Sequence, residues 1–275
     1  SNAPYLLDKA RAGHRMGHGK VTDHMFMDGL EDAYDKGRLM GSFAEDSAQA
    51  YGFTREQQDD FAEQSLLRAQ EAISQGWFAE EIVPVEIAQR KGSVTVSEDE
   101  QPPKADLAKI RQLRPAFSQD GTVTAANSSS ISDGAAALVL MRQSEAQQRG
   151  LTPIAVIRGH SAHAAAPHLF TSAPVGAIHK LLERTGLTLD QVDLFEINEA
   201  FAVVTMIAMR ELNLPADKVN VHGGACALGH PIGASGARIL VTLLAALKQK
   251  NKRLGVAAIC IGGGEATAIA VELLA

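Results

Sequence analysis

Apolar side chains recur every three or four positions between residues 54 and 75, which predicts an amphipathic helix. The recurring residues are Phe61, Leu66, Ala69 and Ile73. Thr54 and Gln57 form a capping-box pair at the start of this stretch, and Gly76 follows its end. It is the first segment of the chain with a strong helical pattern.

The segments on either side of this predicted helix have no such periodicity. Residues 1–53 are rich in Gly, Asp and Met, so we expect a surface loop region there. Residues 83–125 are predicted to form short strands and loops, because prolines interrupt them repeatedly. These prolines are Pro84, Pro102, Pro103 and Pro115.

From about residue 126 the pattern changes to apolar runs that alternate with helical segments. The predicted strands are 135–141, 154–162, 192–197, 219–222, 254–261 and 266–274, and the predicted helices are 174–186, 200–212 and 233–248. Strands that alternate with helices predict an α/β layered fold. Because most of the strands are continuously apolar, we expect both faces of the sheet to be covered.

Composition narrows the function classes. The chain has 275 residues, is 45% hydrophobic and carries a net charge of −6 without a long basic block, so nucleic acid is not an expected partner. Since there is no apolar run of 18 residues and no signal peptide at the start, we expect no membrane partner and a cytoplasmic location. Two cysteines, Cys226 and Cys260, give no disulfide framework.

Three segments carry candidate chemistry, and all lie where predicted strands end, which is where open α/β sheets bind ligands. They are Asn198-Glu-Ala-Phe, the Gly-rich segment 222–236, and Cys260-Ile-Gly-Gly-Gly. Gly224 and Gly229 have the spacing of a P-loop, but His230 and Pro231 stand where Lys and Ser/Thr are required. The dinucleotide-binding fingerprint is also missing, so neither nucleotide hydrolysis nor hydride transfer is indicated.

A metal site in the Gly-rich segment is a weaker hypothesis. His222, Cys226 and His230 are four positions apart and would share one face of a helix. Glycines and a proline within the same segment oppose a continuous helix, so no metal is predicted. Taken singly, Cys260 is typical of a buried structural cysteine beside a turn, and Asn198 of a helix N-cap.

Taken together, these segments resemble the thiolase family. Asn-Glu-Ala-Phe, Gly-His-Pro-Ile-Gly-Ala-Ser-Gly and Cys-Ile-Gly-Gly-Gly occur in the family's order. A fourth family segment is matched by 122–129 (Thr-Val-Thr-Ala-Ala-Asn-Ser-Ser), which Asp133-Gly-Ala-Ala follows. Within the family, His222-Gly-Gly-Ala-Cys-Ala-Leu-Gly-His most resembles the acetyl-CoA acetyltransferases, which join two acetyl-CoA molecules into acetoacetyl-CoA or cleave it by the reverse thiolysis.

The resemblance implies a thiolase-like α/β core, of which 126–275 would be the C-terminal half, preceded by a loop domain at 1–125 that covers coenzyme A. It implies coenzyme A and acetyl-CoA as substrates, no tightly bound cofactor, and a role in fatty acid metabolism. Three predicted substrate contacts follow: Ser129 beside the pantetheine, and Met40 and Phe201 as walls of the pocket.

The same resemblance assigns the chemistry. His230 would activate the nucleophilic cysteine and help to bind the thioester oxygen. Cys260 would be the acid/base cysteine, with its pKa lowered by a nearby imidazole. Asn198 would hold a water that completes one oxyanion hole, and the backbone N–H of Gly262 would contribute to the other.

Three departures from the family pattern follow. The nucleophilic cysteine is expected in a segment ahead of Ser1, so the chain is expected to begin after it. Leu39 stands where many acetoacetyl-CoA thiolases have a histidine, which leaves the preferred acyl chain length open. Pro102 falls near a place where some relatives have a basic coenzyme A contact, so no phosphate-binding residue is predicted.

Several alternatives remain open. One is a degradative 3-ketoacyl-CoA thiolase with a longer acyl specificity. Another is a non-catalytic coenzyme A-binding or assembly fragment, since half of a layered core would expose apolar surface. For that reason we expect either a homo-oligomer or association with the missing N-terminal thiolase segment. A third alternative makes Cys226 the nucleophile.

Overall fold

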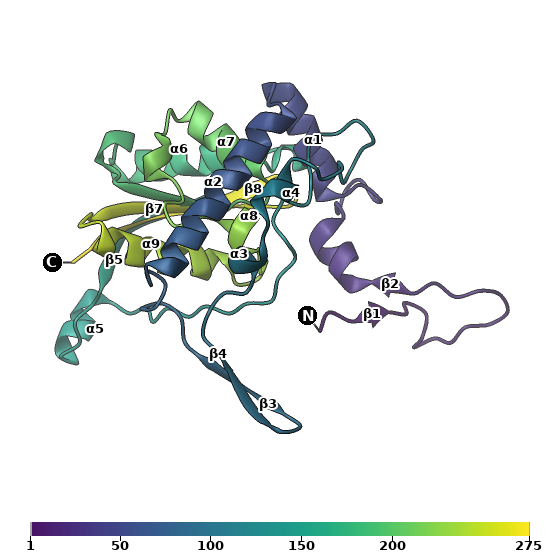
Figure 1. The fold of residues 1–275 in the computed structure, drawn as a ribbon, viewed down its shortest axis with the longest axis horizontal. Helices are drawn as coiled ribbons and strands as arrows, with labels where there is room; N and C mark the ends of the chain where they lie inside the picture. Colours follow the sequence, from purple (N-terminus) through teal and green to yellow (C-terminus); the bar gives the residue numbers. More distant parts are fainter. Residues whose placement is uncertain (1, 275) are drawn as a thin grey trace.

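The computed structural model describes residues 2–274, and its centre is a four-stranded mixed sheet (Figure 1). The strands are β5 (Ala155–Ala164), β6 (Leu194–Ile197), β7 (Leu254–Ile261) and β8 (Glu265–Leu273), in the order β5-β8-β7-β6. β6 and β7 run parallel, whereas β8 is antiparallel to both of its neighbours. Gly263 and Gly264, with φ of 98° and 90°, allow the tight turn between β7 and β8.

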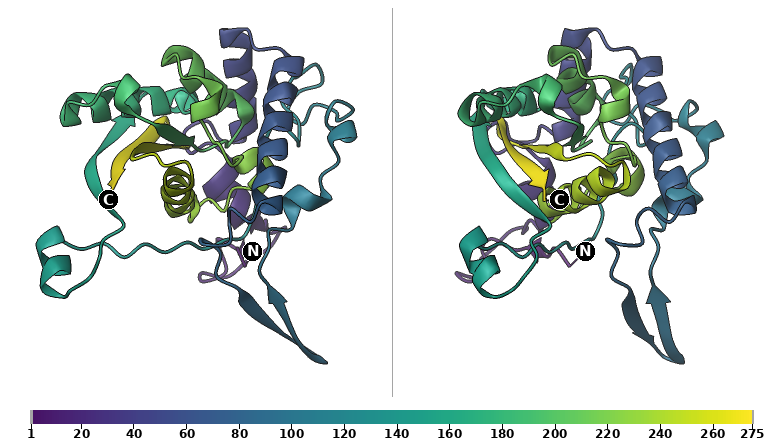
Figure 2. Two further views of the ribbon diagram at one scale, coloured as in Figure 1. Left: turned by 60° about the vertical axis from the view of Figure 1, so that its left-hand side comes forward. Right: turned by 90° about the vertical axis from the view of Figure 1, so that its left-hand side faces the viewer.

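Helices cover the two faces of this sheet, as the views in Figure 2 show. On one face lie α6 (Ala173–Thr185) and α7 (Ala202–Glu211), which bury Ile178, Leu181 and Ala208 against Phe195 and Ile197 of β6. On the other face lies α9 (Ser235–Gln249), which packs on Leu194 and Ala257. Alternate residues of β6 thus face opposite helical layers, as a strand buried on both sides requires. The predicted α/β class is confirmed.

Two further helices pack outside α7. The predicted helix at 54–75 is α2 (Arg55–Ser74), and its capping box is formed by the Thr54 and Gln57 side chains. Ahead of it, α1 (Met40–Tyr51) buries Ala44 and Ala48 against Val203 and Ile207 of α7. α2 also contacts the short helix α8 (Ala225–Leu228), so the Gly-rich segment lies between α2 and the sheet.

The remaining elements are short, and several extend away from this body (Figure 1). They are β1 (Tyr5–Leu6), β2 (Thr22–Asp23), the π-helix Phe26–Leu30, the hairpin β3 (Val85–Gln89) and β4 (Gly92–Val96), α3 (Gln101–Lys104), α4 (Leu107–Ile110), α5 (Gln143–Gln148), and single 3-10 turns at Pro167–Leu169, Leu189–Gln191 and Ala216–Lys218. In the part of the chain that the structure describes, no helix is both long and apolar enough to cross a membrane.

The prediction of a loop region over 1–53 was wrong for Met40–Tyr51, which form α1. The buried face of α1 consists largely of small residues, Gly41, Ala44, Ser47 and Ala48, with Phe43 as its large apolar side chain. A face of this kind gives little hydrophobic contrast along the sequence. It is helical because it fits closely against α7 and the 3-10 turn at Pro167–Leu169.

Two predicted strands are absent from the described chain. Residues 135–141 are irregular, and Val139 and Leu140 are 87% and 69% exposed, because no described strand lies beside them to complete a ladder. At 219–222 only Val219 forms a bridge, with Phe195. Asn220 then turns the chain with a φ of 46°, and its side-chain oxygen accepts from the Ile197 N–H in place of a backbone partner.

The expectation that both faces of the sheet are covered is only half right. β6 is buried throughout, and only the last residue of β7, Ile261, is exposed. β5, at the sheet edge, is largely accessible, and its Ile157 is 43% exposed. A continuous apolar run therefore did not distinguish a central strand from an edge strand.

Candidate active site

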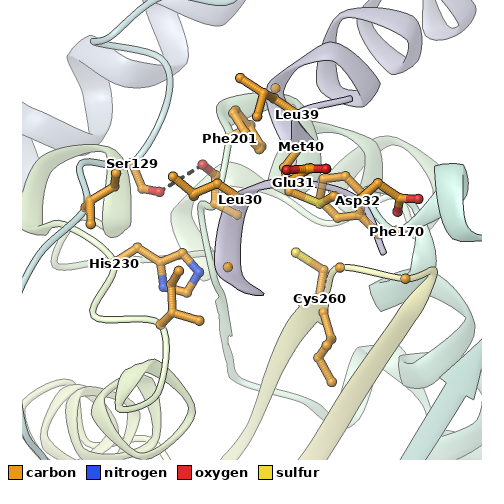
Figure 3. A pocket seen from close by; sticks show the side chains of 18 of the residues that line it. Leu30, Glu31, Asp32, Leu39, Met40, Ser129, Phe170, Phe201, His230 and Cys260 are labelled. Atoms are coloured by element: carbon orange, nitrogen blue, oxygen red, sulfur yellow. Dashed lines mark hydrogen bonds between the residues drawn. The ribbon is translucent and has the colours of Figure 1, made fainter. Parts of the chain in front are cut away.

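A cavity of about 700 Å³ opens where β6, β7 and the Gly-rich segment end (Figure 3). Its walls come from the π-helix and the loop after it, the start of α1, Phe117, the segment 128–131, Phe170, the segment that follows β6, the Gly-rich segment, and the end of β7 with the turn after it. Among the lining residues are Asp32, Leu39, Met40, Ser129, Phe170, Phe201, His230, Cys260 and Gly262. Every predicted site residue except Asn198 lines this one cavity.

His230 is held at the cavity by polar contacts on both ring nitrogens. Its Nδ1 lies 2.6 Å from Ser235 Oγ, and its Nε2 lies 3.4 Å from Asn198 Nδ2. Burial, with a smaller contribution from the positive charge of Arg238, lowers the pKa of His230 to about 4. The imidazole is therefore neutral at pH 7, as a general base must be before it acts.

Asn198 lies just behind His230 and completes this polar cluster. It follows β6, where its backbone N–H donates to the Ala258 carbonyl at 3.0 Å. The side chain is buried, and its Oδ1 has no hydrogen-bond partner among residues 2–274. Since buried polar atoms are almost always satisfied, this oxygen is suited to a water or a substrate group at the cavity.

Cys260 enters the cavity from the end of β7, opposite His230 in Figure 3. It packs against Phe43, Phe170 and Val204, and burial raises its pKa to about 12. The predicted lowering of this pKa by a nearby imidazole is therefore wrong for the thiol as described. The neutral imidazole supplies no positive charge to stabilise a thiolate, so desolvation decides the shift.

Gly262 and Met40 lie close together at the same end of the cavity. A Cβ added to Gly262 would lie 3.1 Å from Met40 Sδ, so glycine leaves room for the methionine. Ser129 and Phe201 line the cavity from other directions: the Ser129 hydroxyl donates to the Ala200 carbonyl at 3.0 Å, and the Phe201 ring contacts Phe117 and Phe170 edge to face.

Two protein-family models together match almost the whole chain. Residues 1–144 match the thiolase N-terminal domain, and residues 151–273 match the thiolase C-terminal domain. The chain belongs to the thiolase family.

Several proteins that are similar to this thiolase chain are named acetyl-CoA acetyltransferases. It is 50% identical over 275 residues to a probable acetyl-CoA acetyltransferase of Dictyostelium discoideum, and it covers 66% of that protein. It is also 50% identical to the acetyl-CoA acetyltransferase of Escherichia coli, of which it covers 70%. The Bacillus anthracis acetyl-CoA acetyltransferase structure superposes with a TM-score of 0.94 at 42% identity, over 98% of this chain and 68% of that one. The chain thus spans about two thirds of the length of these relatives.

The other cysteine of this thiolase chain lies in different surroundings. The Cys226 thiol faces the Glu199 carbonyl, and burial and the Glu199 charge raise its pKa well above the usual range. These surroundings disfavour Cys226 as the nucleophile. His222 stacks on Trp77 at 5.0 Å instead of joining His230, and within residues 2–274 no three His, Cys, Asp or Glu side chains gather as metal ligands would.

Two features in or beside the cavity were not predicted from the sequence. Asp32 is 1% exposed and caps its own loop, because its Oδ2 accepts from the Tyr34 and Asp35 N–H groups at 2.8 and 2.6 Å. Ser235, the partner of His230, lies inside the motif that carried the resemblance but was not assigned a role. An Asp side chain that accepts from the backbone two residues on is common in turns generally, so only the folded structure reveals that this one lies at the cavity.

Proposed function

We propose that the chain acts as an acetyl-CoA C-acetyltransferase, which condenses two acetyl-CoA molecules to acetoacetyl-CoA and coenzyme A or runs the reverse thiolysis. The observation that carries the proposal is the placement of His230, Cys260 and Gly262 around one cavity of a thiolase fold, with Asn198 beside His230. The names of the relatives, which are about half identical to the chain, support the same activity.

His230 supplies the base. Its neutral Nε2 accepts the proton of an attacking thiol, and the imidazolium so formed then donates the same proton as a hydrogen bond to the thioester oxygen. The base and the oxyanion donor are thus successive states of one nitrogen. Asn198 lies beside this nitrogen, and its free Oδ1 is suited to hold a water that becomes a further donor to that oxygen.

Cys260 transfers the proton to and from the reacting carbon C2. In thiolysis, a thiolate attacks the keto carbon of acetoacetyl-CoA, the bond between C2 and C3 breaks, and C2 leaves as the carbanion of acetyl-CoA. The Cys260 S–H then donates its proton to C2. A thiol with a pKa of about 12 is present in the protonated form that this step requires, and the Gly262 N–H would stabilise the enolate oxygen.

The attacking thiol is expected from outside the groups described above. Cys260 is used as acid and base, and the surroundings of Cys226 hold it protonated. The family resemblance predicts the nucleophile in the N-terminal part of the family's fold. The proposal is therefore that this nucleophile joins the groups described above in one site, in the cytoplasm, within a homo-oligomer or together with that N-terminal thiolase segment.

A second candidate is a coenzyme A-binding fragment without catalysis of its own. The exposed apolar residues of 135–141 favour it, because such a surface associates readily with another protein segment. A third is a degradative 3-ketoacyl-CoA thiolase, which Leu39 at the cavity wall leaves open. Turnover of acetoacetyl-CoA compared with longer 3-ketoacyl-CoA substrates separates the third candidate from the first.

Calorimetric titration of the chain with acetyl-CoA tests the binding part of the proposal. We expect saturable binding that Gly262→Val weakens, because the added side chain would collide with Met40. Gly233→Val is the matched control, since a Cβ at Gly233 has no neighbour within 4 Å and this residue is exposed. Absence of binding, or equal weakening by both variants, would contradict the proposed site.

A further inference from the structure

The Ser235 hydroxyl lies against one ring nitrogen of His230. The short turn that begins at Pro231 places Ser235 at the start of α9, where it is completely buried. Its Oγ lies 3.1 Å from the Pro231 carbonyl oxygen and 2.6 Å from His230 Nδ1. A hydroxyl has one proton, and the carbonyl can only accept it. When the hydroxyl donates to this carbonyl, its Oγ accepts from the imidazole, and Nδ1 carries the hydrogen.

The contact of Asn198 with the other ring nitrogen favours the same tautomer of His230. The amide nitrogen Nδ2 can only donate, so Nε2 must accept across the 3.4 Å that separates them. With the hydrogen on Nε2 instead, two N–H groups would face each other in a buried site. Both contacts of His230 are attractive in only one neutral tautomer, with Nδ1 protonated and Nε2 free.

The tautomer matters because the ring is neutral. Burial and the Arg238 charge keep the imidazole unprotonated at pH 7, so one of its nitrogens is a base and the other is not. His230 lines the cavity, and its Nε2 points to the Asn198 side of it. If Nε2 carried the hydrogen, no basic nitrogen would be available for a thiol in the cavity.

We propose that Ser235 is a positioning residue that holds His230 in the Nδ1-protonated tautomer and so leaves Nε2 as the base of the site. The catalytic consequence rests on the proposed function. The tautomer itself is a property of the free chain, so it can be measured without substrate, and the two ideas can fail separately.

The decisive measurement is a ¹⁵N NMR spectrum of the chain labelled at histidine nitrogens, with the signals of His230 assigned by their loss in His230→Gln. We expect a protonated Nδ1 and an unprotonated Nε2 in the unaltered chain at pH 7. A protonated Nε2 in the unaltered chain would overturn the proposal at once, and this result needs no variant to fold.

Ser235→Ala tests the cause. Removal of the hydroxyl should shift His230 toward the Nε2-protonated form, and Ser235→Thr, which restores a hydroxyl, should shift it back. Ser161→Ala is the control, since the Ser161 hydroxyl also donates to a buried carbonyl, that of Ala177, and Ser161 lies on β5, at the opposite edge of the sheet from β6. A Ser235→Ala spectrum identical to that of the control would show that Ser235 does not set the tautomer.

A kinetic measurement then separates positioning from simple stabilisation. In an active enzyme that contains this chain, Ser235→Ala should lower kcat by at least about tenfold and by no more than the ~10²–10⁴-fold that general base catalysis contributes, and it should leave KM nearly unchanged. Ser161→Ala should leave kcat within about twofold of the parent. Equal kcat values for the two variants would refute a role for Ser235 in the activity.

Discussion

The stretch 222–230 of the Gly-rich segment has a histidine at each end, His222 buried and His230 partly buried, and the two residues differ in almost everything except their pKa. Burial lowers the pKa of both His222 and His230 to about 4. The His222 ring lies between Trp77 and Phe78, and its Nδ1 has no hydrogen-bond partner among residues 2–274. His230 has a polar partner on each nitrogen and lines the cavity.

This difference shows that a shifted pKa does not by itself identify a functional histidine. Desolvation acts equally on a ring that fills the core and on a ring that faces a substrate cavity. The distinguishing features are access to the cavity and partners that fix the ring. The expected effects of substitution at the two ends are therefore opposite, one on activity and the other on stability.

The largest expected effect is on catalysis at the His230 end. We use a complemented chain, in which the part of the Escherichia coli acetyl-CoA acetyltransferase that precedes the match is joined ahead of this chain. His230→Gln in it should lower kcat for acetoacetyl-CoA thiolysis about 10²–10⁴-fold, because the base is lost. The free energy of unfolding, measured with urea, should change by less than about 1 kcal/mol. An unchanged kcat in this variant would show that His230 is not the base of the site.

Asn198→Ala should have the next largest effect. It removes the amide beside Nε2 and the oxygen suited to hold a water, and loss of one oxyanion-hole donor typically lowers kcat about 10²–10³-fold. Steady-state kinetics of the complemented chain give the value, and circular dichroism checks the fold. A rise in KM at constant kcat would instead indicate a binding role.

At the other end, His222→Ala should lower the stability of the fold and leave kcat nearly unchanged. Removal of a ring stacked on Trp77 leaves a cavity in the core, which should cost about 2–3 kcal/mol of unfolding free energy. The kcat of the complemented chain should stay within a few fold of the parent. If His222→Ala abolished turnover in a protein that still folds, the proposed difference between the two ends would be wrong.

A smaller effect is expected from pH. The pKa of His222 is about 4 in the folded chain and near 6.5 when unfolded, so the unfolded chain binds more protons between these values. The stability contributed by the neutral ring is complete above pH 6.5 and is lost as the pH falls toward 4. The destabilisation by His222→Ala, measured with urea, should therefore shrink from pH 7 to pH 4. An equal cost at both values would show that the folded pKa is not lowered.

The parts of the fold that the sequence predicted well are those with local signals. The capping box of α2 and the apolar runs of β6, β7 and β8 can each be recognised from a few consecutive residues. α1 and residues 135–141 were mispredicted because their state depends on distant partners. The small residues of α1 become helical against α7, whereas 135–141 has no described strand beside it.

For the candidate site, too, some features could be predicted from the sequence and others depend on the fold. His230, Cys260 and Asn198 were predicted because they lie in motifs that resemble a known family. The raised pKa of Cys260 was not predicted, because it depends on the apolar side chains that surround the thiol. The role of Ser235 was not predicted either, since it rests on the direction of one hydroxyl relative to one ring.

The most direct test of the account is thiolysis of acetoacetyl-CoA, measured side by side for this chain alone, the complemented chain, and the complemented chain with Cys260→Ala. We expect turnover by the complemented chain only, because the surroundings of both Cys226 and Cys260 raise their pKa values and so disfavour either thiol as the attacking group. Turnover by the chain alone at the rate of the complemented chain would show that one of its own cysteines is the nucleophile. Full activity of the Cys260→Ala variant would contradict the role assigned to Cys260.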